Sequence, residues 1–305
     1  MRMSDSLSFP GIEPPSPTLS ARLGELADYF AAPTAGRLTD EQRALSLGIA
    51  RRLVADVAAL IDPGIDAAAL WEEWLHHGVP GAARLVGPCF ARAEEHRWRA
   101  LSTERAVPTP VADGADEVGG ATPDTPMTAR ERAYLDLRIA DRRRFDAYGQ
   151  PTLAIADLDE EIFRALLHDV AAWRLAAVST DTGRAASLGD AVRYAVERHA
   201  DAPDMTAAAI SYREAVGAAL PEAARTAIAA HDWPALIALA AAAQHRRYTD
   251  MALALLTAEM TALPSLLAPL RLDREALAPL EASLAMLTAR AVSDADGVTA
   301  AETGR

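Results

Sequence analysis

Apolar residues recur at every fourth position between residues 45 and 61, which is the spacing of one face of an α-helix. The stripe consists of Leu45, Ile49, Leu53, Val57 and Ile61. Thr39 precedes it and Gln42 follows three residues later, a pair that forms a capping box at a helix start. Pro63 and Gly64 then interrupt the pattern. The sequence therefore predicts a helix that begins after Thr39 and ends before Pro63.

Apolar stripes separated by proline or glycine continue along the rest of the chain. In the first hundred residues they predict further helices at about 19–30, 66–76 and 82–101. A second capping box, Thr128 with Glu131, opens a helix that runs to about Tyr148. Ser187 and Asp190 are expected to cap a helix to about residue 200. The remaining helices are expected at 158–178, 204–219, 221–231, 234–243, 246–262 and 273–290. Strand-like alternation is never sustained, so the predicted fold class is all-α.

Three segments rich in Pro, Gly, Ser, Asp or Thr flank or separate the helices: residues 1–18, 102–127 and 291–305. Such composition cannot bury enough apolar surface to offset the chain entropy, so we expect these segments to be disordered. The middle one then acts as a linker between an N-terminal helical unit, 19–101, and a C-terminal unit, 128–290. Each unit is expected to be a helical bundle or a HEAT-like array.

Two of the expected helices share a signature. Residues 49–60 and 162–173 both read Ile-x-Arg-x-Leu-apolar-x-Asp-Val-Ala-Ala-apolar, with seven identical positions. Repeated helices of this kind occur in arrays that bury their apolar faces by stacking. Asp56 and Asp169 hold the same place in the two copies, beside the apolar face. We expect both carboxylates to be structural.

The segment 37–45, Arg-Leu-Thr-Asp-Glu-Gln-Arg-Ala-Leu, and the segment 51–57, Arg-Arg-Leu-Val-Ala-Asp-Val, resemble the opening of an uncharacterised alphaproteobacterial family of helical, HEAT-like character. The run from about 218 to 267 is similar to that family in style. The resemblance implies a helical scaffold or regulatory protein, and it brings no catalytic residues with it. The Pro/Gly-rich segment at 102–127 departs from the family pattern, which puts a continuous array in doubt.

The formal net charge of −13 narrows the range of partners. An acidic chain repels phosphate backbones, so we expect no nucleic-acid binding. The longest run of small apolar residues, 235–243, is too short to span a bilayer, and residues 1–18 lack the basic start and apolar run of a signal peptide. The single cysteine, Cys89, excludes an intrachain disulfide and is expected to be a buried thiol. Together these features predict a cytoplasmic protein without membrane insertion.

Few patterns in the sequence point to chemistry. Glu73 and His76 have the Glu-x-x-His spacing of di-iron helical bundles, but the chain has no second such motif. His76 and His77 are therefore expected to complement a helix C-terminus. Phosphate-binding glycine loops and a Gly-x-Ser-x-Gly elbow do not occur in the sequence. We predict no metal, no cofactor and no catalytic residue, while an enzyme whose site assembles only in three dimensions stays open.

His168 is the position at which the second signature adds chemistry that the first lacks, since Ala55 is its counterpart. It precedes Asp169 on an expected helix, and this pair is similar to the phosphorylated histidine and following acid of phosphotransfer bundles. The adjacent carboxylate can orient the imidazole. His168 and Asp169 are therefore the candidate phosphoacceptor pair of an alternative signalling function.

The function that we favour is a non-enzymatic helical scaffold or regulatory protein that binds another protein. Large aromatic side chains anchor many interfaces, so Trp71, Trp74 and Trp233 are interface candidates wherever they are exposed. Acidic residues compensate the arginine cluster near the end of its helix, which favours a solvated or partner-facing helix over a nucleic-acid contact. The cluster adds three interface candidates: Arg142, Arg143 and Arg144. The identity of the partner and the oligomeric state stay open.

Overall fold

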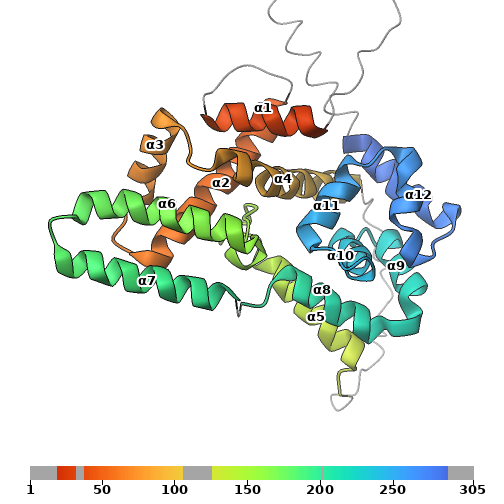
Figure 1. Ribbon diagram of the computed structural model, residues 1–305. Coiled ribbons are helices and arrows are strands. Elements are labelled where there is room, and N and C mark those ends of the chain that lie inside the picture. Colours follow the sequence, from red (N-terminus) through yellow and green to blue (C-terminus); the bar gives the residue numbers. More distant parts are fainter. Residues whose placement is uncertain (1–18, 32–37, 106–125, 201, 288–305) are drawn as a thin grey trace, which may run out of the picture.

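The structure is a computed structural model that describes residues 19–31, 38–105, 126–200 and 202–287 (Figure 1). Within these ranges the chain consists of helices and connecting turns, which confirms the predicted all-α class. The β-structure of the described residues is limited to an isolated bridge between Phe145 and Pro151. The predicted tails, 1–18 and 291–305, and residues 106–125 of the predicted linker lie outside the described residues.

The longer helices are α1 (Leu19–Ala31), α2 (Asp40–Ile61), α3 (Ala67–His77), α4 (Ala82–Arg105), α5 (Ala129–Arg142), α6 (Glu160–Val178), α7 (Thr182–Ala200), α8 (Met205–Val216), α9 (Leu220–Ala229), α10 (Trp233–Ala243) and α11 (Tyr248–Thr257). The one-turn helix α12 (Leu263–Leu266) and helical residues 274–287 complete the described chain. Among all these helices, none combines the length and the apolar character that crossing a membrane requires.

Both predicted capping boxes are present. Thr39 accepts a hydrogen bond from the N–H of Gln42, and the Gln42 side chain accepts one from the N–H of Thr39. Thr128 and Glu131 make the same exchange at the start of α5. Each box satisfies two backbone N–H groups that have no partner within the helix. The local sequence alone therefore fixes where α2 and α5 begin.

Helix α7 begins earlier than the sequence suggests. It starts at Thr182 rather than near Ser187, because the Asp181 carboxylate caps it by accepting a hydrogen bond from the N–H of Arg184 at 3.0 Å. An aspartate at this position stabilises a helix start by about 1 kcal/mol. Since the cap lies directly after α6, only a tight turn separates the two helices, and they pack side by side (Figure 1).

The ends of α4 and α5 also differ from prediction. α4 continues to Arg105, so residues 102–105 of the predicted linker are helical. α5 ends at Arg142 instead of near Tyr148. The chain reverses after it around Gly149, whose φ of 78° suits a residue without a Cβ. Backbone hydrogen bonds across this reversal, from 146 to 150 and from 152 to 144, close the loop.

The first of two hydrophobic cores lies among α1, α2, α3, α4, α6 and α7, the left-hand part of Figure 1. The two signature helices, α2 and α6, pack against each other in this core. Ile49, Leu53 and Val57 of the first copy, and Leu166 and Val170 of the second, are all buried there. The repeated pattern thus supplies two neighbouring helices of one core.

The second core lies among α5, α8, α9, α10, α11, α12 and residues 274–287, with Trp98 from the end of α4 inserted into it. Trp98 and Trp233 stack with their ring centroids 4.4 Å apart. Helices α6 and α7, which the sequence places in the C-terminal unit, belong to the first core instead. The division into cores therefore does not follow the linker, and α4 extends from one core to the other (Figure 1).

Candidate functional site

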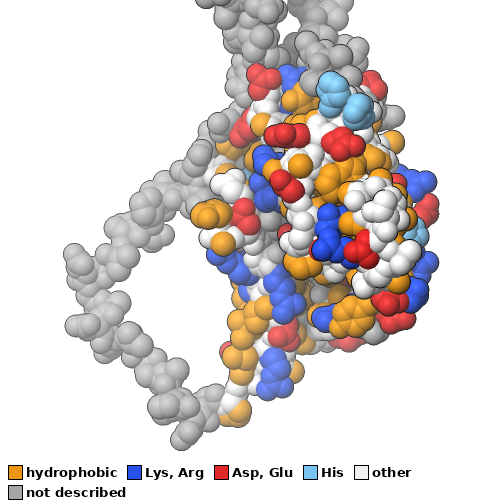
Figure 2. Space-filling view, turned by 90° about the vertical axis from the view of Figure 1, so that its left-hand side faces the viewer, with side chains coloured by type: hydrophobic (Ala, Val, Ile, Leu, Met, Phe, Trp, Pro, Cys, Tyr) orange, Lys and Arg blue, Asp and Glu red, His pale blue; other side chains and the backbone are white. Residues whose placement is uncertain are grey.

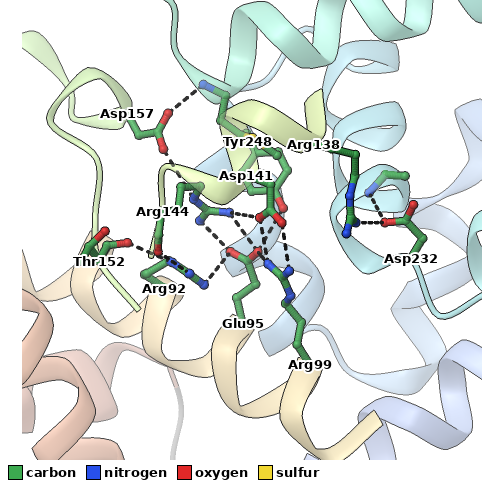
Figure 3. Close-up of polar contacts among 12 residues, drawn as sticks. Arg92, Glu95, Arg99, Arg138, Asp141, Arg144, Thr152, Asp157, Asp232 and Tyr248 are labelled. Carbon is green, nitrogen blue, oxygen red and sulfur yellow. Dashed lines mark hydrogen bonds and ion pairs between the residues drawn. The ribbon is translucent and has the colours of Figure 1, made fainter. Parts of the chain in front are cut away.

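A set of charged side chains, two of them buried and Arg99 half-buried, lies on α4 where the two cores meet (Figure 3). Arg92, Glu95 and Arg99 are spaced by three and four residues, so they lie on one face of the helix. Glu95 is 0 % exposed, which means that every interaction of its carboxylate is with the protein. Together with Asp141, Arg144, Asp157 and Tyr248 these residues form what we call the buried network.

Arg144 is the centre of the buried network. Its Nη1 and Nη2 donate to the two oxygens of Glu95 at 2.9 and 2.7 Å, a bidentate pair. Its Nε lies 3.5 Å from Oδ2 of Asp157. The Tyr248 hydroxyl of α11 donates to Glu95 at 3.1 Å, and the Arg144 guanidinium lies over the Tyr248 ring. These contacts join α4, the end of α5 and α11.

Arg92 holds the loop that follows α5. Its side chain donates to the carbonyl of Arg144 at 2.7 Å and to the carbonyl of Thr152 at 3.0 Å. The guanidinium groups of Arg92 and Arg99 both lie over the Phe145 ring, at 4.6 and 5.2 Å from its centroid. Arg92 therefore fixes the two ends of the loop to α4.

Asp157 connects the same loop to α8. Its Oδ1 accepts a hydrogen bond from the N–H of Met205 at 2.7 Å, at the first turn of that helix. Arg247 donates to the carbonyl of Asp157 at 2.6 Å and to the Asp159 carboxylate at 3.1 Å. The N-terminus of α8 and the Arg144 guanidinium both lie beside the Asp157 carboxylate, and both favour its negative charge.

The charges of the buried network balance, with three arginines and three carboxylates. Burial acts to raise the pKa of Glu95, but Arg144 and Arg92 outweigh it, and the pKa falls to about 2. Burial lowers the pKa of Arg92 to about 10, with Arg144 adding to this effect. For Asp157, burial outweighs the attraction of Arg144 and raises the pKa. Glu95 and Arg144 are at most 1 % exposed, so the network is closed to solvent in this structure and forms a junction between the two cores.

Close to the buried network, one side of α5 is exposed to solvent. We call it the outer face of α5 and define it as Arg132, Leu135, Ile139, Arg142 and Arg143. All five side chains are exposed, and the exposed fractions of Leu135 and Ile139 are 45 % and 44 %. Figure 2 shows hydrophobic and basic side chains, with a few acidic ones among them, along the narrow lower part of the molecule. Within the described chain, none of the three arginines has an ion-pair partner.

A groove borders α5 on its side toward α8, α9 and α10. One part, about 430 Å³ in volume, lies between Tyr134, Tyr212 and the alanines of α9. Tyr134 donates to Asp232 at 2.5 Å, and Arg138 contacts the same carboxylate at 3.2 Å. These two contacts fix the near edge of α5 to α10 and leave the outer face free.

The tryptophans that the sequence suggests as interface anchors are core residues. Trp71 and Trp74 lie in the first core and Trp233 in the second, each at most 6 % exposed. They therefore present no surface to a partner. The reason is their size: burying a large aromatic ring removes more apolar surface from water than burying any aliphatic side chain.

The three arginines of the predicted cluster have different environments in the structure. Arg142 and Arg143 are exposed, as expected of a solvated or partner-facing segment. Arg144 is buried instead, because the chain leaves the helix after Arg142 and turns this side chain toward Glu95. As an interface candidate Arg144 is corrected to a residue of the buried network.

His168 is exposed on α6, and Asp169 beside it is half-buried. Burial raises the pKa of Asp169, with Arg84 and His168 acting in the opposite direction. Asp169 lies next to Pro80, Gly81 and Arg84 at the start of α4, away from the buried network. A phosphoacceptor role for His168 stays a prediction.

Sequence reasoning missed both the buried network and the apolar part of the outer face. The signal for the network was the run 91–99, in which charged residues fill the face of α4 that faces the junction. The signal for the outer face was that α5 carries apolar residues on two sides, Leu137 on one and Leu135 with Ile139 on the other. α5 therefore carries a second apolar strip on the side that faces away from the core. No family model, no curated protein and no solved structure matches this chain.

Proposed function

We propose that this is a helical scaffold or regulatory protein that binds another protein through the outer face of α5. The observation that carries the proposal is the exposure of Leu135 and Ile139 between arginines that lack ion-pair partners. Fully burying an exposed Leu or Ile contributes about 1.5–3 kcal/mol, and part of this gain is still available at side chains that are 45 % and 44 % exposed. In keeping with the sequence, we place this partner in the cytoplasm.

The way α5 is held supports this proposal. Leu137 and Asp141 on its inner side are buried, and Asp141 accepts two hydrogen bonds from Arg99 at 2.8 and 2.9 Å. The helix also packs along α8. A surface that is already rigid loses little entropy when a partner binds it, so more of the contact energy appears as affinity. The buried network thus prepares the outer face for binding.

The proposal is tested by affinity capture from the source cells with the full chain, followed by quantitative mass spectrometry. The test variant is Leu135→Ser/Ile139→Ser. Its control is Leu175→Ser/Ile210→Ser, which removes the same two residue types at 43 % and 45 % exposure on α6 and α8. We expect at least one protein to be retained by the wild type and the control and lost by the test variant. If the three samples retain the same proteins, the outer face is not the interface.

A phosphotransfer function using His168 is the second candidate, and the exposure of this histidine on α6 favours it. Acetyl phosphate is the phosphodonor for the test, and the product is assayed for acid-labile phosphate. The candidate requires a label that disappears in His168→Ala and persists in His77→Ala, which changes another exposed histidine. An unlabelled wild type eliminates it.

A further inference from the structure

The outer face of α5 is a straight row of side chains. Arg132, Leu135, Ile139 and Arg142 are spaced by three, four and three residues, so they follow one side of the helix. At a rise of 1.5 Å per residue the row is about 15 Å long. Two aliphatic side chains form its centre and an arginine stands at each end. This arrangement is complementary to a short amphipathic helix that carries an apolar stripe flanked by charged residues.

The charge of this row is opposite to that of the molecule. The whole chain carries −13, whereas this side of α5 carries three arginines that form no ion pair within the described chain and one exposed carboxylate, Asp136, four residues after Arg132. By contrast, Arg138 on the neighbouring side of α5 is paired with Asp232 at 3.2 Å. Acidic groups of a partner would supply the missing counter-charges.

We infer that the outer face of α5 binds an acidic amphipathic helix of a partner protein, an inference that rests on the function proposed above. The apolar stripe of the partner helix packs against Leu135 and Ile139. Its Asp or Glu residues lie beside Arg132 at one end and beside Arg142 and Arg143 at the other. The contact is a packing of one helix on another, in which apolar anchors give affinity and flanking charges set the orientation.

A second copy of this chain fits the face less well. A two-fold symmetric contact places the same patch on both sides of the interface. If two α5 helices met through their outer faces, an antiparallel pair would bring Arg132 close to Arg142, and a parallel pair would bring each arginine close to its own copy. Both arrangements oppose like charges across an apolar centre, which costs free energy.

Nucleic acid also fits the face less well than an acidic helix does. A phosphate backbone would satisfy the arginines, but it has no apolar surface to cover Leu135 and Ile139. The remaining charge of the chain would repel it. The aliphatic centre of the row therefore favours a protein over a polyanion.

The test measures binding of labelled peptides to the full chain by fluorescence anisotropy. The main probe is an acidic amphipathic peptide about 18 residues long, enough to form a helix on the surface. The comparison probes are the same peptide with Lys in place of Glu, a scrambled acidic peptide of equal composition, and a DNA duplex. We expect the acidic amphipathic peptide alone to bind, with an affinity that falls as salt concentration rises.

Charge-reversal variants locate the contact. Arg132→Glu/Arg142→Glu is expected to weaken binding of the acidic peptide about tenfold, since each reversal replaces an attraction by a repulsion. Arg51→Glu/Arg213→Glu is the control, because it changes the net charge equally at exposed arginines of α2 and α8. It is expected to leave the affinity within about twofold. Equal weakening by both variants would show a non-specific charge effect and overturn the inference.

Different results would overturn the class of partner and the location of the interface. If affinity capture identifies a partner that depends on Leu135 and Ile139 while the scrambled or the basic peptide binds as well as the acidic helix, the partner class is wrong and the interface stands. If the DNA duplex binds in an Arg132- and Arg142-dependent manner, the face is a polyanion site and the inference is overturned. If no partner depends on Leu135 and Ile139, the proposed function itself fails.

Discussion

Glu95 and Arg144 are joined by two hydrogen bonds of 2.9 and 2.7 Å, although 49 residues separate them in the chain. Both side chains are essentially inaccessible to solvent. A buried pair of this kind contributes little net stability compared with apolar residues of equal size, but the loss of one partner leaves a buried charge uncompensated. The pair therefore makes the packing of α4, the end of α5 and α11 depend on one geometry.

We expect Glu95→Gln to lower the free energy of unfolding by about 3–5 kcal/mol, because Arg144 keeps its charge and loses its principal counter-charge. Guanidinium unfolding followed by circular dichroism and by tryptophan fluorescence measures the change. The control is Glu160→Gln, which breaks the exposed pair with Arg164 and should cost less than about 0.5 kcal/mol. The double variant Glu95→Gln/Arg144→Met should cost less than the sum of the two single variants. Strict additivity would contradict a direct coupling between the two residues.

The pH dependence of the same variant gives a second prediction. The pKa of Glu95 is about 2 in the folded chain, below its ordinary value of 4.5. A lowered carboxyl pKa stabilises the fold fully above about pH 4.5, and this contribution is lost as the pH falls toward 2. The difference in unfolding free energy between wild type and Glu95→Gln should therefore be constant above pH 4.5 and shrink below it. Comparing the two chains cancels the titration of carboxyls that lie outside the buried network.

A difference that grows as the pH falls would mean that Glu95 is not held ionised in the folded chain. Asp157 would act in that direction, because burial raises its pKa and its contribution to stability falls as the pH rises through that value. The Asp157→Asn variant therefore provides a contrast of opposite sign within the same network, read in the same titration.

Local signals in the sequence predicted where the helices lie along the chain better than they predicted how the helices pack together. The capping boxes of Thr39 and Thr128 act over three residues, so the sequence alone identifies them. The environment of Arg144 depends on Glu95, Asp157 and Tyr248, which come from three other parts of the chain. Composition near Arg144 indicated an exposed cluster because nearby acids compensate its charge, and only the chain reversal after α5 turns it inward.

The same limit applies to the cores. The apolar faces of α6 and α7 were recognisable, but nothing local indicates which core covers them. The linker at 102–127 suggested that they pack with the helices that follow, whereas Phe163, Leu166 and Val170 pack with α2 of the first core. Part of the interface proposal could be predicted: Arg142 and Arg143 were candidates, while the exposure of Leu135 and Ile139 required the packing of α5 to be known.

A third prediction concerns Ser102, whose side chain lies between the two stacked tryptophans and residues 274–287. Its Oγ accepts a hydrogen bond from Nε1 of Trp233 at 2.9 Å and lies 2.9 Å from the hydroxyl of Ser283. Ser102→Ala leaves the buried Trp233 N–H without this acceptor and should cost about 1–3 kcal/mol. Ser211→Ala, at an exposed position of α8, is the control and should be close to neutral. Chemical denaturation measures both, and equal effects would exclude a special role for Ser102.

Cys89 gives the last prediction, on the dynamics of the first core. Its side chain is fully buried, and burial raises the thiol pKa to about 12. Since the thiolate is the reactive form, native protein should react with a disulfide reagent at pH 8 only when the core opens. The reaction should therefore be slow in the native chain and fast in guanidinium. If opening requires the buried network to break, Glu95→Gln should accelerate labelling by about tenfold for each 1.4 kcal/mol of stability lost, with the denatured rate unchanged. Unaltered native labelling in a variant of proven lower stability would show that the first core opens around Cys89 independently of the junction.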